Sequence, residues 1–219
     1  VRTASEVRTR LFMAKWSMED VGSSCHLHSS LWDAEGTESL TWDPDAADHM
    51  SEVYRHYVGG LIATGRELAW CYAPYVNSYK RYMPDSWAPT ALVWGRDNRT
   101  CGLRTVGHGK GFRVENRVPG ADCNPYLAFA ATIAAGLHGI EQGIEPGPAY
   151  TANAYEAADV PRVPATLVEA IELFEASEVA REAFGEDVHH HLLNTAKQEW
   201  ASANKVVTDW ELQRGFERI

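Results

Sequence analysis

The sequence has few of the features that assign a protein to a special class. Its 219 residues include four cysteines, at positions 25, 71, 101 and 123, and no two of them form a Cys-x-x-Cys pair. Neither a zinc site built on paired cysteines nor a dense disulfide framework is indicated, and a reducing cytoplasm is the expected setting. The sequence has no run of eighteen apolar residues, and VRTASEVRTR at its start lacks the apolar stretch of a signal peptide.

A surplus of basic residues is also missing. Twenty Lys and Arg residues stand against thirty Asp and Glu residues, which gives a formal net charge of −10 at pH 7. This balance argues against nucleic acid or an anionic membrane as the main partner. With 45% hydrophobic and 23% charged residues, the chain has the composition of an ordinary globular domain. Because it does not begin with Met, we expect a fragment, a processed form or a numbering that covers only part of something larger.

Hydrophobic periodicity predicts a helix followed by a sheet. Apolar residues three to four positions apart predict a helix over 48–73, capped by Asp48 or Ser51 and closed by Pro74. Between residues 90 and 118 the pattern changes to short β-rich pieces separated by Gly and by Asn/Asp turns. These pieces predict an antiparallel sheet.

The second half of the chain is predicted to be mainly helical. In DCNPYLAFAATIAAGLHGI, Asn124 is placed to cap a helix, Pro125 occupies its first position and Gly143 ends it. Apolar residues nearly all round this helix predict burial on most sides. After a loop rich in Pro, Gly and Ala over 146–164, amphipathic helix is predicted, including 187–217. The fold class expected is α+β, an antiparallel sheet with flanking helices.

The segment GSSCHLHSS could carry chemistry. As a strand it places Ser24, His26, His28 and Ser30 on one face, because successive side chains alternate. Two imidazoles on one face can bind a cation or donate hydrogen bonds to phosphate oxygens. His-x-His alone is weak evidence, since strand histidines with ordinary hydrogen-bond partners are commoner than ligands.

The segment FRVENRV has the same alternation. It places Arg113, Glu115 and Arg117 on one face, with Val114 and Val118 packing inward. The charged residues could form a surface ion-pair ladder. Alternatively, Glu115 could bind a metal ion beside arginines that hold a carboxylate or a phosphate. The sequence leaves both interpretations open.

A third segment, over 77–104, is rich in basic residues. Several guanidinium groups that converge on one pocket would suit a substrate carboxylate and a polyphosphate, whose transfer depends on charge stabilisation. The alternative is a set of surface salt bridges that each contribute at most about 1 kcal/mol. The basic residues are Lys80, Arg81, Arg96, Arg99 and Arg104.

Five motifs in a fixed order give the chain a family resemblance. GSSCHLH, NSYKRYMP with the following AP, GRDNRTCGLR, RVENRVPGADCNPYLAFAATIAAGLHGI and VTDWELQRGFERI cover most of it, from about Ala14 to Ile219. Together they resemble the C-terminal catalytic part of the glutamine synthetase superfamily. The resemblance implies that residues 1–219 are part of that catalytic domain. It also implies that the N-terminal β-grasp domain and the strands with the other metal ligands lie outside this chain.

The resemblance implies a site for ATP and a divalent cation. His26 and Glu115 match ligands of Mg²⁺ or Mn²⁺, while His28 and Ser30 match the segment that contacts ATP. Gly22 matches the position that meets the substrate glutamate, and further matching arginines have roles in substrate binding and catalysis. These are Arg81 and Arg117 for glutamate and its developing γ-phosphate, and Arg99 and Arg104 for the nucleotide phosphates.

The resemblance also implies a reaction, in which ATP phosphorylates the γ-carboxylate of glutamate and an amine attacks the γ-glutamyl phosphate. Two positions depart from the family pattern. Val21 replaces an Asn, and Trp87 replaces the Glu that binds ammonium and takes its proton. An indole accepts no proton but offers a flat apolar wall.

We therefore expect a glutamate–amine ligase that uses an organic amine and assembles into a double-ring dodecamer or a smaller ring. The alternatives are a glutamine synthetase that uses ammonium and an inactive family member with a structural or regulatory role.

Overall fold

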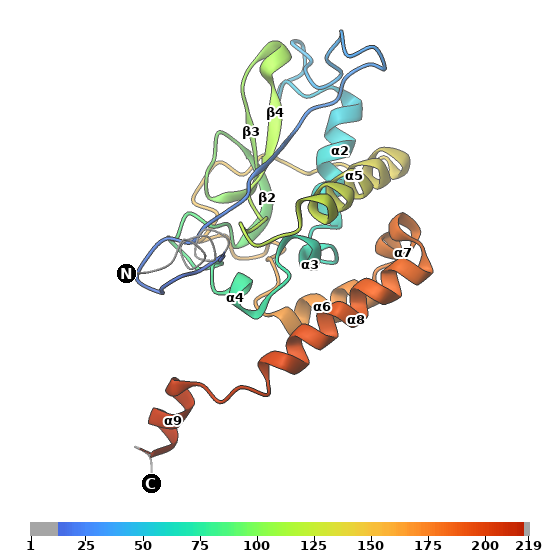
Figure 1. Ribbon diagram of the computed structural model, residues 1–219. Coiled ribbons are helices and arrows are strands. Elements are labelled where there is room, and N and C mark those ends of the chain that lie inside the picture. Colours follow the sequence, from blue (N-terminus) through green and yellow to red (C-terminus); the bar gives the residue numbers. More distant parts are fainter. Residues whose placement is uncertain (1–12, 217–219) are drawn as a thin grey trace, which may run out of the picture.

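The computed structural model describes residues 13–216, which form a four-stranded sheet with flanking helices (Figure 1). The strand order is β1-β4-β3-β2, and β4 is antiparallel to both β1 and β3, whereas β2 pairs with β3 in parallel. The α+β class is confirmed, with a mixed sheet rather than an antiparallel one. The strands are β1 (Leu27–Ser29), β2 (Ala91–Arg96), β3 (Cys101–Val106) and β4 (Arg113–Asn116).

The parallel pair has a local cause. Asp97 follows β2 with a φ of 48°, in the left-handed region, and its N–H donates to the carbonyl of Thr105 at 2.9 Å. The connection then returns to the start of β2, where Cys101 pairs with Ala91. Strand β3 therefore runs in the same direction as β2, an arrangement that strand propensities and turn residues do not reveal.

The helices begin where their capping residues predict. Ser51 accepts a hydrogen bond from Tyr54 N and Asn124 accepts one from Tyr126 N, as N-caps do. Gly143, with a φ of 61°, ends the helix that Asn124 begins. The helices are α2 (Glu52–Ala63), α3 (Ala69–Tyr72), α4 (Val76–Tyr79), α5 (Pro125–Gln142), α6 (Leu167–Ala176), α7 (Glu178–Phe184), α8 (Glu186–Ala203) and α9 (Asp209–Phe216), with a 3₁₀ turn, η1, at Gly109–Gly111.

Two predicted helices are interrupted. The helix expected over 48–73 ends at Ala63 and resumes as α3, and the helix expected over 187–217 ends at Ala203 and resumes as α9. In Figure 1, α9 projects away from the other elements. Within residues 13–216 no helix combines the length and the apolar character needed to cross a membrane.

The core lies between the sheet and two packed helices, α2 and α5. Tyr54 and Leu61 of α2 and Ala131 of α5 share one buried cluster with Leu103 of β3 and Val114 of β4. Helices α6, α7 and α8 form a further group beside α5 (Figure 1). The helices therefore cover one face of the sheet, and the opposite face remains for polar side chains.

The predicted burial of α5 on most sides is wrong for the described chain. Its side toward α2 is buried, but Tyr126, Phe129 and Ile133 are exposed by 83%, 52% and 56%. The distribution of apolar residues around a helix does not show which neighbours cover each of its sides.

Glycines allow α2 and α5 to approach closely. A Cβ on Gly60 would lie 2.0 Å from the carbonyl oxygen of Ala135 and 2.7 Å from Cα of Gly139. Gly60 and Gly139 both lie inside helices, where a glycine costs up to about 1 kcal/mol relative to alanine. The close crossing explains why glycine is nevertheless required.

We predict that Gly60→Ala lowers the free energy of unfolding by about 2 kcal/mol, because the overlap with backbone atoms outweighs the gain in helix propensity. Urea unfolding followed by circular dichroism measures the change. Gly111→Ala is the matched control, since a Cβ there meets no atom within 4 Å. If the two variants are equally stable, the close crossing does not constrain the packing.

Candidate active site

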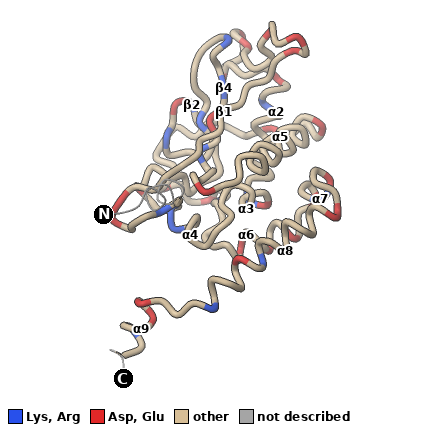
Figure 2. Tube along the Cα trace, viewed as in Figure 1, with Lys and Arg blue, Asp and Glu red and all other residues tan. Residues whose placement is uncertain are grey.

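Three polar side chains from three strands form one row across the sheet. The register pairs His28 of β1 with Glu115 of β4, and Glu115 with Arg104 of β3. Since Val114 faces the helices, alternation turns Glu115 toward the uncovered face. Figure 2 shows several Lys and Arg positions near the strands. The site is therefore locally basic in an acidic chain.

The carboxylate of Glu115 binds basic groups on both of its oxygens. Oε1 lies 3.1 Å from His26 Nδ1 and 3.7 Å from His28 Nε2. Oε2 accepts from Arg117 Nη1 at 2.9 Å and from Arg104 Nη1 at 3.1 Å. Burial alone would raise the pKa of Glu115, but the hydrogen bonds from Arg117 and Arg104 lower it to about 2. Glu115 is thus ionised at physiological pH.

Both histidines are held in the neutral form. Burial, followed by the charge of Arg117, lowers the pKa of His26, and burial is also the main cause that lowers the pKa of His28. Arg113 Nε donates to His28 Nδ1 at 3.1 Å, so the proton of the neutral ring is on Nε2, facing Glu115. The imidazole of His28 can therefore donate a hydrogen bond, while His26 can offer a lone pair.

Two arginines are buried at the edge of this row. Arg81 is 2% exposed and Arg117 is 5% exposed, and within residues 13–216 the Nε atom of each has no hydrogen-bond partner. Arg81 Nη2 donates to the carbonyl of Val118, and Arg117 Nη2 donates to the carbonyl of Trp87 at 3.1 Å. Among the described residues, Arg81 has no carboxylate within ion-pair distance.

These arginines line a cavity of about 190 Å³ together with Gly22, His26 and Trp87. Gly22 fits closely, because a Cβ there would lie 2.6 Å from Cγ of Arg81. A second cavity, of about 640 Å³, is also lined by Trp87, and Arg99 is among its other lining residues. The exposed indole of Trp87 thus borders both spaces.

Most of the predicted site residues converge, and two do not. The sheet row and the smaller cavity bring together Gly22, His26, His28, Arg81, Trp87, Arg104, Glu115 and Arg117. Arg99 is exposed in the neighbouring cavity, and Ser30 lies past β1, where it accepts from Trp32 Nε1 at 3.0 Å. Their predicted contacts with ATP remain predictions.

Sequence reasoning missed some partners of these residues. Asp97 forms an ion pair with Arg104 and so holds the guanidinium beside Glu115. Arg113 was placed on the charged face, but its hydrogen bond to His28 was not anticipated. A signal was available in both cases, since these charged residues lie within or next to the segments already singled out.

The donor atoms suit a divalent cation in kind. His26 is neutral and Glu115 is ionised, which is the form in which each binds a metal ion. Within residues 13–216, however, no group of three or more His, Cys, Asp and Glu side chains is arranged to hold a metal ion. His26 and Glu115 could therefore supply only part of a coordination shell.

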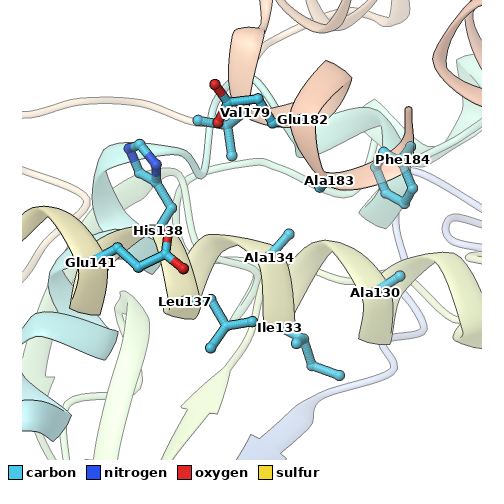
Figure 3. A pocket seen from close by; sticks show the side chains of 10 residues that line it. All are labelled: Ala130, Ile133, Ala134, Leu137, His138, Glu141, Val179, Glu182, Ala183 and Phe184. Atoms are coloured by element: carbon cyan, nitrogen blue, oxygen red, sulfur yellow. The ribbon is translucent and has the colours of Figure 1, made fainter. Parts of the chain in front are cut away.

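A further cavity is separate from this site. It has a volume of about 490 Å³ and lies between α5 and α7, where α5 contributes Ala134, His138 and Glu141 (Figure 3). Ile133 and Leu137 of α5 also line it and are about half exposed. Because α5 stands between this cavity and the sheet, the cavity is not part of the polar row.

Residues 4–215 match the glutamine synthetase catalytic domain, and the chain belongs to that family. It is 50% identical to the gamma-glutamylethanolamide synthetase of Streptomyces coelicolor over 99% of the chain and 46% of that protein. It is 41% identical to the glutamate–isopropylamine ligase of a Pseudomonas species over 96% of the chain and 46% of that protein.

Other relatives share the same region. The glutamine synthetase of Methanosarcina mazei is 37% identical, over 93% of the chain and 47% of that protein. A solved structure described as a complex of GmaS with ADP superposes with a TM-score of 0.84 and 32% identity, covering 94% of this chain and 49% of that one. The chain thus spans about half the length of the relatives that it matches.

We predict a pH-dependent role for Glu115 in stability. Its folded pKa, about 2, lies below its ordinary value of 4.5, so the ionised carboxylate stabilises the fold above about pH 4.5 and this contribution is lost as the pH falls toward 2. Glu115→Gln should lower the free energy of unfolding by about 3 kcal/mol at pH 7 and by progressively less below pH 4.5.

Urea titrations between pH 7 and pH 3 measure this difference. The control is Glu141→Gln, a change in an exposed carboxylate that should alter stability by less than about 0.5 kcal/mol at every pH. A difference between wild type and Glu115→Gln that stays constant with pH would contradict the assigned ion pairs.

Proposed function

We propose that this chain is the C-terminal catalytic part of an ATP-dependent ligase that joins glutamate to an organic amine through γ-glutamyl phosphate. The observation that carries the proposal is the pair of buried guanidinium groups beside the small cavity, Arg81 and Arg117, whose Nε atoms have no partner in the described part of the chain. A buried guanidinium with an unpaired N–H is unfavourable, and Arg81 also has no carboxylate at ion-pair distance among the described residues. An anionic ligand in the cavity would supply the missing acceptors.

The chemistry of the ligand follows from the donors. Planar guanidinium groups bind carboxylates and phosphoryl oxygens through paired hydrogen bonds. Arg117 also contacts Glu115, so one side chain links the cavity to the row that contains His28 and Arg104. Negative charge that develops on a transferring phosphoryl group would be stabilised from both directions. Glutamate in the cavity and ATP along the row fit this arrangement.

The cation and the assembly are part of the same proposal. His26 and Glu115 would hold Mg²⁺ or Mn²⁺ with further ligands from outside the described residues, and His28 with Arg104 would contact ATP. A divalent cation supplies charge neutralisation at the phosphates when it is bound. An oligomer of rings is implied by the family resemblance, with neither nucleic acid nor membrane as a partner.

Trp87 supports an organic amine as the second substrate. Its indole is 61% exposed and borders both cavities, where it presents an apolar surface to a hydrocarbon and a π face to an ammonium group. It offers no carboxylate to bind ammonium and take its proton. Two proteins that match at 50% and 41% identity are named for ethanolamide synthesis and isopropylamine ligation, whereas the glutamine synthetase of M. mazei matches at 37%.

The direct test is phosphate release from ATP by this chain joined to an upstream half like that of its relatives. We expect release that requires glutamate together with an organic amine from a panel of ethanolamine, alkylamines, polyamines and anilines. Phosphate release with glutamate and ammonium, but with none of the organic amines, would make the protein a glutamine synthetase. If calorimetry detects no binding of ATP with a divalent cation, the inactive family member is the correct alternative.

We predict that Trp87→Glu shifts the amine preference. The new carboxylate can bind ammonium and accept its proton, so kcat/KM for ammonium relative to the best organic amine should rise at least about tenfold, or about 1.4 kcal/mol. Trp87→Phe is the matched control, because it keeps an aromatic side chain on the same backbone. An unchanged amine profile in Trp87→Glu would show that the indole does not select the nucleophile.

A further inference from the structure

The loop that carries Trp87 has a strained backbone. Asp85 and Trp87 have φ values of 58° and 61°, in the left-handed region that residues other than glycine rarely adopt. Such conformations persist when surrounding contacts hold them. The exposed indole of Trp87 supplies little packing, so the loop is held by its backbone and by Ser86. The hydroxyl of Ser86 donates to the carbonyls of Arg81 and Met83.

Two consecutive carbonyls at the end of the loop are held from different sides. Arg117 Nη2 donates to the carbonyl of Trp87 at 3.1 Å, from within the site. The hydroxyl of Tyr155 donates to the carbonyl of Ala88 at 3.0 Å, from a segment 67 positions later in the chain. The main chain beside the indole is therefore fixed by one basic group of the site and by one phenol outside it.

The backbone around Tyr155 is anchored independently of its hydroxyl. Asn98 Nδ2 donates to the carbonyls of Tyr150 and Ala152 at 3.0 and 2.9 Å. Thr100 Oγ1 accepts from the N–H of Ala154 at 2.9 Å. Because these contacts remain when the phenol oxygen is removed, a substitution of Tyr155 by phenylalanine isolates one hydrogen bond.

The phenol is in the correct protonation state for this contact. Burial raises the pKa of Tyr155, and this effect exceeds the lowering by the charge of Arg117. Tyr155 is thus a neutral donor at physiological pH. Tyr155 is not among the described residues that line the two cavities beside Trp87. Any effect of Tyr155 on those cavities therefore passes through the loop.

We propose that Tyr155 is a positioning residue that sets the place of the Trp87 loop and thereby the affinity for the amine. The inference rests on the proposed function, since it concerns the same nucleophile. A loop released at Ala88 would lose the defined position of the indole, while Arg81 and the row around Glu115 keep their own contacts. Binding of the amine should therefore weaken more than binding of glutamate or ATP.

The kinetic test compares Tyr155→Phe with Tyr150→Phe in the chain joined to an upstream half. Tyr150 lies in the same segment and is held through its backbone, which makes it a matched control. We expect Tyr155→Phe to raise KM for the amine about fivefold, or about 1 kcal/mol, with KM for glutamate and ATP within twofold of wild type. Tyr150→Phe should change none of the three. Equal changes in all three constants, or an unchanged amine KM, would overturn the proposal.

A second measurement does not depend on the reaction. Hydrogen–deuterium exchange should become faster in peptides that cover residues 83–90 of Tyr155→Phe, with peptides of α5 unchanged and an unchanged melting temperature. Unaltered exchange in the loop refutes the positioning role. If the wild-type protein accepts ammonium and no organic amine as the second substrate, the proposed function fails. The KM for ammonium and the hydrogen–deuterium exchange of the loop then still decide the role of Tyr155.

Discussion

The carboxylate of Glu115 is the interaction on which the arrangement of the site depends. Four basic side chains converge on its two oxygens, and without this charge the guanidinium groups of Arg104 and Arg117 would repel each other. The sheet makes the convergence possible, because the register of three strands places His28, Glu115 and Arg104 in one row. The packing of α2 and α5 on the opposite face fixes that sheet.

The positive charges of the arginines in the site are neutralised to different extents. Glu115 pairs with Arg104 and Arg117, while Arg81 donates to the carbonyl of Val118 and has no acidic group at ion-pair distance in the part of the chain described. The cavity therefore retains positive charge although the whole sequence carries −10. A local field of this kind can attract an anion that the overall charge would repel.

Local rules predicted much of this architecture. Strand alternation placed His26 with His28 and Glu115 with Arg117, and capping residues placed the start and the end of α5. What these rules miss comes from contacts between distant residues. The parallel pairing of β2 and β3 depends on the path of a four-residue connection, and the contact between Tyr155 and Ala88 spans 67 positions. Neither leaves a periodic pattern in the sequence.

In the function proposed above, the Trp87 loop separates the activation of glutamate from the selection of the amine. Its backbone accepts hydrogen bonds from Arg117 of the site and from Tyr155 of the surrounding fold, whereas its exposed indole borders two cavities. Because the main-chain contacts do not depend on the identity of the side chain, that side chain can change without loss of Arg81, Arg117 and the row around Glu115. This division gives a physical reason why relatives named as a glutamine synthetase, a gamma-glutamylethanolamide synthetase and a glutamate–isopropylamine ligase can share one catalytic fold. In the proposed function, selectivity for the amine depends on one side chain and on the contacts that hold its backbone in place.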